Sequence, residues 1–265
     1  MQRLVLALLT SVLVGCASTT PPPVVTCNPG HALLNGALWM QSAAEYRAAA
    51  MQTYANARMA LDRELAASSG GLPPAVILDL DETALDNSAF EGRMVHRGMT
   101  YDTKLWKEWT AEGAATAVPG AAEFLQYARS RGVRPFYVTN RDLDEETGTR
   151  RNLEALGFPL DPSVDTLLQR GENGWKSDKT QRREFVAQTH RVLLLLGDDL
   201  NDFVNAREKT LAEREALLNE HASDWGTRWF ILPNPLYGSW ETAVTEGKGT
   251  PCEQMEKKVG ALRER

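Results

Sequence analysis

Positive charge, histidine and cysteine are scarce in this sequence, and each shortage argues against a class of protein. Its 265 residues include 29 Lys and Arg against 35 Asp and Glu, so the net charge is −6. Such a chain has no general attraction for a nucleic-acid polymer, whose phosphates require a basic surface. The four histidines show no metal-ligand spacing, which argues against a zinc protein. A phosphate-bearing substrate would have to be attracted by a local cationic site.

The first residues have the pattern of an export signal. An apolar run from Leu4 to Val14 follows Arg3 and is too short to cross a bilayer as a helix. It leads into Leu-Val-Gly-Cys, ending at Cys16, which resembles the processing box of bacterial lipoproteins. The resemblance implies a signal peptide at 1–15 and a lipidated Cys16 that anchors the protein in the cell outer membrane or periplasm. An ordinary signal peptide cleaved elsewhere is the alternative.

Two cysteines, Cys27 and Cys252, would remain beyond the anchor. Export places them in an oxidising compartment, where a disulfide can persist. We therefore predict that they form a disulfide joining the two ends of the chain, with two free thiols as the alternative. Residues 16–29 contain three consecutive prolines and are expected to form a tether between the membrane and the folded part.

Beyond an alanine-rich helical region at 30–71, short apolar runs alternate with helical patterns. This alternation predicts an α/β fold, in which helices cover both faces of a parallel sheet. The expected strands lie at 75–78, 136–138, 166–168, 192–196 and 229–232, and the expected helices at 119–131, 144–156, 179–188 and 201–220.

Acidic residues follow two of these strands at their carboxyl ends. Asp79 and Asp81 come after the first strand, and Asp198 and Asp202 after the fourth. Ligands of open parallel sheets bind at this edge, so we expect these side chains to meet in one crevice. Two carboxylates about 4 Å apart repel by roughly 4 kcal/mol at an effective dielectric of 20. A divalent cation removes that cost, and Mg²⁺ fits best because it binds through a few carboxylates, waters and substrate phosphate.

Two other metals are disfavoured at this site. A calcium loop that began at Asp79 would need Gly at its sixth position and Glu at its twelfth, where the sequence has Ala84 and Phe90. Zinc is disfavoured because no His or Cys lies near these acids.

Several motifs together resemble the haloacid-dehalogenase superfamily and, more narrowly, its class C acid phosphatases. The matching segments are DLDETALDNS at 79–88, YVTNR at 137–141, KSDK at 176–179, GDDLNDF at 197–203 and YGSW at 237–240. The resemblance implies a Rossmann-like parallel sheet with a smaller α-helical cap. The phosphatase core would span 72–265 with a cap insertion at about 90–117, and the helices of 30–71 would pack as part of the cap.

The resemblance also implies Mg²⁺-dependent hydrolysis of phosphomonoesters, as in acid phosphatases and 5′-nucleotidases. Asp79 would attack phosphorus and form an aspartyl-phosphate, and Asp81 would act as general acid and then as general base. Thr139 and Lys179 would bind the phosphoryl oxygens. The Mg²⁺ ligands would be Asp79, the main-chain carbonyl of Asp81, Asp198 and, through metal-bound water, Asp202.

Three further residues, Arg141, Trp106 and Tyr237, are expected to contact substrate. The two aromatic residues match positions that flank a nucleobase in the family, and stacking tolerates any base. Nucleoside 5′-monophosphates are therefore the expected substrates. The alternatives are that Arg141 is a surface residue and that Trp106, three residues before Trp109, belongs to a helix core face.

The rival interpretation is a surface lipoprotein that binds haem or a nucleotide on a phosphatase scaffold. Intact Asp79 and Asp81 disfavour it, because a binding protein needs no proton donor beside a nucleophile. An intracellular-type phosphomutase is disfavoured by the export signal. The sequence leaves the preferred phosphomonoester and the oligomeric state open.

Overall fold

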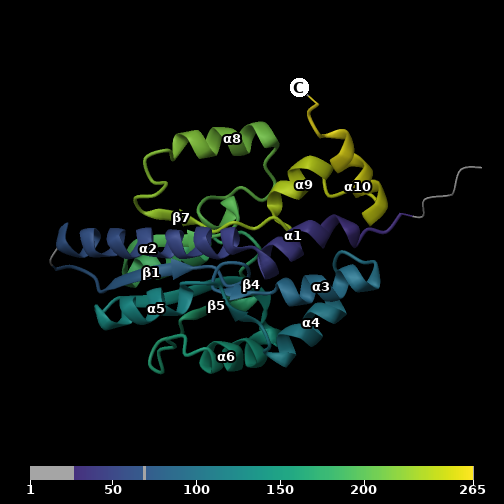
Figure 1. Ribbon diagram of the computed structural model, residues 1–265. Coiled ribbons are helices and arrows are strands. Elements are labelled where there is room, and N and C mark those ends of the chain that lie inside the picture. Colours follow the sequence, from purple (N-terminus) through teal and green to yellow (C-terminus); the bar gives the residue numbers. More distant parts are fainter. Residues whose placement is uncertain (1–26, 68–69, 265) are drawn as a thin grey trace, which may run out of the picture.

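The computed structural model describes residues 27–264, apart from 68 and 69 (Figure 1). The expected signal peptide, Cys16 and the tether up to residue 26 lie outside the described residues. Within the described part, no helix is both long enough and apolar enough to cross a membrane.

A five-stranded parallel sheet lies at the centre of the molecule. Its strands are β1 (Pro74–Leu78), β4 (Arg134–Asp142), β5 (Leu167–Arg170), β6 (Arg191–Gly197) and β7 (Trp229–Ile231). They pair in the order β5-β4-β1-β6-β7, and every neighbouring pair is parallel. In β1, Val76 and Leu78 pack into one core while Ala75 and Ile77 pack into the other, so both faces of the sheet are buried. The α/β fold predicted from the sequence is confirmed.

Helices surround this sheet, and short elements join them. The α-helices are α1 (His31–Ser42), α2 (Ala44–Ala67), α3 (Ser88–Arg97), α4 (Thr103–Glu112), α5 (Ala121–Ser130), α6 (Glu146–Ala155), α7 (Thr180–Thr189), α8 (Leu211–Glu220), α9 (Ser239–Thr245) and α10 (Pro251–Gly260). Three short 3₁₀ turns span Leu143–Glu145, Glu172–Gly174 and Leu200–Asp202, and β2 (Leu85–Asp86) pairs antiparallel with β3 (Thr116–Ala117).

The cap is an insertion between β1 and α5. It consists of α3 and α4, and the β2–β3 pair closes its base. The rings of Phe90 and Trp106 pack edge to face with centroids 5.1 Å apart, which joins the two helices. Helix α1 packs against α3, and Gln41 Nε2 donates a hydrogen bond to Ser88 O at 2.8 Å.

The sequence predicted that all of 30–71 packs as part of the cap, but the second N-terminal helix does not. Helix α2 instead packs on α5, β6 and β7, where it covers the sheet (Figure 1). Its buried face carries Tyr54, Ala57 and Leu61 at helical spacing, and the small alanine lets the helix approach closely. Tyr54 also packs against the ring of Phe124 and donates a hydrogen bond to the carbonyl of Thr83 at 2.7 Å.

The expected helix at 201–220 is split. The chain makes only a 3₁₀ turn over Leu200–Asp202, and Asp199 caps its start by accepting from the Asn201 N–H at 2.8 Å. The α-helix begins at Leu211, where Thr210 and Glu213 form a capping box.

A disulfide between Cys27 and Cys252 joins the chain just before α1 to helix α10, with the two Cα atoms 6.1 Å apart. Since the bond connects residues 225 apart in the sequence, it links opposite ends of the folded chain.

Candidate active site

Three carboxyl groups converge at the carboxyl edge of the sheet. Asp79 follows β1 and Asp198 follows the adjacent strand β6, while Asp202 belongs to the 3₁₀ turn that comes next. Each offers an oxygen that lies within 4.8 Å of the others. Gly197 permits this approach, because a Cβ at that position would lie 2.4 Å from the side chain of Asp202.

Lys179 pairs with two of the three carboxyl groups. Its ammonium donates to Asp79 Oδ1 and, at 2.6 Å, to Asp202 Oδ1, and the residue is only 4% exposed. Burial alone would lower the pKa of Lys179, but the charges of Asp202 and Asp79 raise it, so the ammonium stays protonated. Lys176, three residues earlier, is exposed.

Main-chain and side-chain hydrogen bonds hold Asp202 and Asp198 in place. Asp202 Oδ2 accepts from the N–H groups of Asp198 and Asp199 at 3.1 and 3.0 Å. Asp198 accepts from Thr83 Oγ1 and Asn234 Nδ2, both at 2.9 Å. Sequence reasoning assigned no role to Thr83 or Asn234, although Thr83 lies inside the first motif.

These residues fit a hard divalent cation. The pKa of Asp79 is raised to about 7, chiefly by burial, with Lys179 opposing the shift and Asp202 adding to it. Burial, followed by the charges of Asp202 and Asp79, raises the pKa of Asp198 well above its usual range. Carboxylates that gather in this way repel one another, and a cation bound by their oxygens would favour the ionised forms.

Asp81 is bound by a residue for which sequence reasoning predicted another role. Arg141 Nε donates to both Asp81 oxygens at 3.0 and 3.2 Å, and Arg141 Nη2 donates to Oδ1 at 2.7 Å. The Arg141 side chain is 1% exposed, so it is not a surface residue, and its guanidinium group is held by Asp81 at the wall of the cavity. Asn87 Nδ2 donates to Asp81 Oδ1 at 2.9 Å and is itself fixed by Trp109 Nε1 at 2.8 Å.

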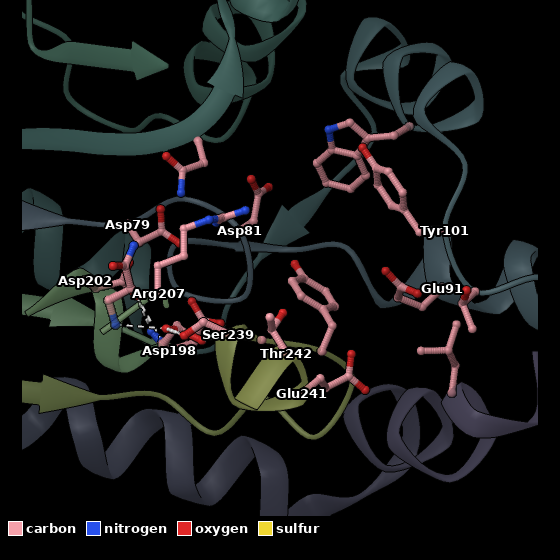
Figure 2. Close-up of a pocket in the computed structure, with 18 of the residues that line it drawn as sticks. Asp79, Asp81, Glu91, Tyr101, Asp198, Asp202, Arg207, Ser239, Glu241 and Thr242 are labelled. Carbon is pink, nitrogen blue, oxygen red and sulfur yellow. Dashed lines mark hydrogen bonds between the residues drawn. The ribbon is translucent and has the colours of Figure 1, made fainter. Parts of the chain in front are cut away.

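A cavity of about 700 Å³ opens beside these groups (Figure 2). The site residues predicted from the sequence that line it are Asp79, Asp81, Trp106, Arg141, Lys179, Asp198, Asp202 and Tyr237. Thr139 does not line it: the residue is fully buried, and its hydroxyl oxygen accepts from the Arg141 N–H at 3.1 Å. The neighbouring Asn140 lines the cavity in its place.

Aromatic side chains form part of the cavity wall. Trp106 is only partly buried and lies with its ring 5.5 Å from the Arg141 guanidinium carbon, so it belongs to the cavity as well as to the cap core. Tyr101, 57% exposed, also lines the cavity and was missed from the sequence. The position of Tyr101 depends on how the segment between α3 and α4 folds, and no motif in the sequence predicts that fold.

Glu82 and Tyr237 are joined across the site. Glu82 has a positive φ of 59°, and its N–H donates to Leu85 O at 2.7 Å, so the chain turns sharply after the first motif. Its fully buried carboxyl accepts hydrogen bonds from the Tyr237 hydroxyl and from the Asn87 N–H. Burial and then the charge of Asp81 raise the pKa of Glu82 well above its usual range. The left-handed conformation of a non-glycine residue cannot be read from the sequence.

The comparisons with known proteins agree with this geometry. A family model described as HAD superfamily, subfamily IIIB (acid phosphatase) matches residues 29–240. The class C acid phosphatase from Bacillus anthracis is 32% identical, with a TM-score of 0.83 over 91% of this chain and 100% of that chain. A structure of that enzyme with tungstate bound gives a TM-score of 0.82 over the same shares, also at 32% identity.

Curated relatives from plants are more distant. A stem 28 kDa glycoprotein from Glycine max is 26% identical over 172 residues, and a stem 31 kDa glycoprotein from the same plant is 25% identical over 168. Each alignment covers 61% of this chain, which spans 58% of the length of these relatives.

Proposed function

The chain belongs to subfamily IIIB of the HAD superfamily, the acid phosphatases, and from this premise we propose that it hydrolyses phosphomonoesters through an aspartyl-phosphate. The observation that carries the proposal is the group of Asp79, Asp198 and Asp202, two of which pair with the buried Lys179, at a cavity that Asp81 also lines. Such a site offers a carboxylate nucleophile, a separate proton donor and a cation for phosphoryl oxygens in one place.

In the first half of the reaction, an Asp79 oxygen attacks phosphorus and the bond from phosphorus to the ester oxygen breaks. Protonated Asp81 gives its proton to that departing oxygen, so the leaving group departs as an alcohol. In the second half, water attacks the aspartyl-phosphate, Asp81 takes a proton from it, and the bond from phosphorus to Asp79 breaks. Inorganic phosphate leaves, and both carboxyl groups return to their starting states.

The chain's own residues position the reactants. Lys179 offers a buried positive charge for the phosphoryl oxygens, while Arg141 and Asn87 orient the Asp81 carboxyl group. Mg²⁺ bound by Asp79, Asp198 and the main-chain carbonyl of Asp81 would neutralise charge on the phosphoryl oxygens.

Nucleoside 5′-monophosphates suit the cavity as substrates. A cavity of about 700 Å³ has room for a nucleoside beyond the phosphate, and Tyr101, Trp106 and Tyr237 supply aromatic surface along its wall. Aromatic faces stack with any base, so we expect the protein to accept nucleotides that carry different bases.

A phosphate-release panel tests the proposal. Nucleoside 5′-monophosphates, sugar phosphates and phenyl phosphate are offered to the wild type with Mg²⁺ or with chelator, and to Asp79→Asn as a matched variant. We expect release only with the cation, a loss of about 10⁴-fold in Asp79→Asn, and inhibition by tungstate. Release that persists in Asp79→Asn would overturn the aspartyl-phosphate route.

We also propose that the protein is exported and anchored by lipid on Cys16, in the outer membrane or periplasm. The disulfide between Cys27 and Cys252 supports export, because such bonds persist in oxidising compartments. Mass spectrometry of the mature amino terminus tests this, and an unmodified terminus beyond residue 16 would contradict it.

A further inference from the structure

The buried carboxyl group of Glu91 faces the cavity at the end away from the acidic cluster. Glu91 lies on α3, is 4% exposed and lines the cavity. Figure 2 shows its carboxyl group pointing into the cavity near Tyr101, whereas Asp79 and Asp202 lie on the opposite side. The hydrolysis proposed above makes no use of Glu91.

Glu91 differs from the neighbouring carboxyl groups of the cavity in its lack of a partner. Asp81 is bound by Arg141, and Glu241 accepts a hydrogen bond from the Lys258 ammonium. Among the residues that the structure describes, none makes a hydrogen bond or ion pair with the Glu91 carboxyl group. The Glu91 oxygens are not among the fully enclosed unpaired atoms, so they are open to the cavity, where a ligand can supply the hydrogen bonds that no side chain supplies.

The charge state of Glu91 defines the ligand that would suit it. Burial, followed by the charge of Glu241, raises the pKa of Glu91 to about 8. In neutral and acidic solution the group is therefore an uncharged carboxylic acid, with one O–H donor beside one carbonyl acceptor. This pattern complements a neutral group in which a donor also stands next to an acceptor.

We propose that Glu91 is a specificity-determining residue that pairs with the edge of a nucleobase carrying a hydrogen-bond donor beside an acceptor. The inference rests on the proposed phosphatase function and names the substrate class of the same site. With phosphate at Asp79, a nucleoside extends across the cavity toward Tyr101 and Glu91 on the far side. Adenine presents an amino donor next to a ring-nitrogen acceptor and so meets the requirement.

Two substrates that differ only in the donor provide the test. Adenosine 5′-monophosphate and purine riboside 5′-monophosphate have the same ring system and ribose, but the second lacks the amino group. We expect the wild type to prefer the first by about tenfold in kcat/KM, mainly through KM. Glu91→Leu should remove this preference, whereas Glu91→Gln, which keeps one donor and one acceptor, should retain most of it. Phenyl phosphate, which has no such edge, should be hydrolysed equally by all three proteins.

Glu208→Gln is the matched control, because it removes an exposed cavity carboxyl group that does not contribute to the pKa of Glu91, and it should leave the preference unchanged. Equal kcat/KM for the two nucleotides in the wild type would overturn the inference without any variant. Equal losses in Glu91→Leu and Glu91→Gln would also overturn it, because they would show that charge, not hydrogen bonding, selects the substrate. If the wild type hydrolyses phenyl phosphate but neither nucleotide, nucleotides are not its substrates. That result would contradict both the proposed substrate class and this inference.

Discussion

The guanidinium group of Arg141 holds both oxygens of the Asp81 carboxyl group, with Nε at 3.0 and 3.2 Å and Nη2 at 2.7 Å. The pair is buried on the arginine side, and Arg141 Nη1 also donates to Thr149 Oγ1 at 3.1 Å. Arg141 is therefore anchored at two points and fixes the orientation of Asp81, the residue that we propose transfers the proton. In that mechanism Arg141 is a positioning residue, which would act on the substrate through Asp81.

Replacement of Arg141 by Lys tests this role. Lysine keeps the positive charge but cannot form the forked contact, so Asp81 should lose its fixed orientation. We expect kcat to fall by about 10- to 100-fold while KM for phenyl phosphate changes little. Arg93→Lys is the control, because Arg93 makes a similar forked contact with Glu112 on the exposed surface and does not line the cavity, and it should leave kcat unchanged. An unchanged kcat in Arg141→Lys would contradict the positioning role.

Lys179 should stabilise the fold as well as serve the reaction. Its removal leaves two buried carboxyl groups without their cationic partner, so Lys179→Met should lower the free energy of unfolding by about 3 kcal/mol. Urea denaturation in the presence of chelator measures this loss. Lys176→Met changes an exposed lysine three residues earlier and should have almost no effect. Similar stability in the two variants would show that the buried ion pairs contribute nothing.

The parts of the site that follow strands could be predicted from the sequence. Asp79 and Asp198 come directly after apolar runs, and parallel strands deliver their carboxyl ends to one edge. Tyr101 and Glu91 could not be predicted, because their positions depend on how the cap segments pack against the core. The same limit applies to α2, since its pattern shows which face is buried but not which element covers it.

Binding of Mg²⁺ should become stronger as the pH rises and the carboxyl groups of the site ionise. The cation binds ionised carboxylates, and protons compete for Asp79, whose pKa is raised to about 7. The rise in Tm caused by millimolar Mg²⁺ should therefore be larger at pH 7.5 than at pH 5. Differential scanning fluorimetry measures the rise. Asp198→Asn removes one of the proposed ligands and should abolish the rise, and an equal rise in that variant would place the cation elsewhere.

Glu91 should make the stability of the wild type fall as the solution becomes alkaline. Its pKa is about 8 in the folded protein and near 4.5 in the unfolded chain, so between these values the folded state binds the extra proton. Unfolding free energy therefore declines as pH rises from 4.5 through 8, by roughly 3 to 5 kcal/mol in total. Glu91→Gln should match the wild type near pH 4.5 and be more stable by that amount at pH 8.5.

A second carboxyl group provides the control for that measurement. The pKa of Glu112 is lowered by a hydrogen bond from Arg93 on the exposed surface, which is the opposite shift. Glu112→Gln should therefore gain no stability at pH 8.5. Urea unfolding of the two variants and the wild type at both pH values makes the comparison, and parallel curves for Glu91→Gln and the wild type would contradict a buried, protonated Glu91.

The disulfide between Cys27 and Cys252 should affect both stability and substrate binding. Because it closes a loop of 225 residues, its loss in Cys27→Ser/Cys252→Ser should lower the free energy of unfolding by about 5.4 kcal/mol in the chain-entropy model. The bond also ties the chain just before α1 to α10, and Leu33 of α1 and Met255 of α10 both line the cavity. Loosening these helices should therefore raise KM for nucleotides more than KM for phenyl phosphate, whose small leaving group does not reach them. Steady-state kinetics of the oxidised wild type and the double variant measure both constants. Equal changes for the two substrates would show that the bond stabilises the fold without shaping the cavity.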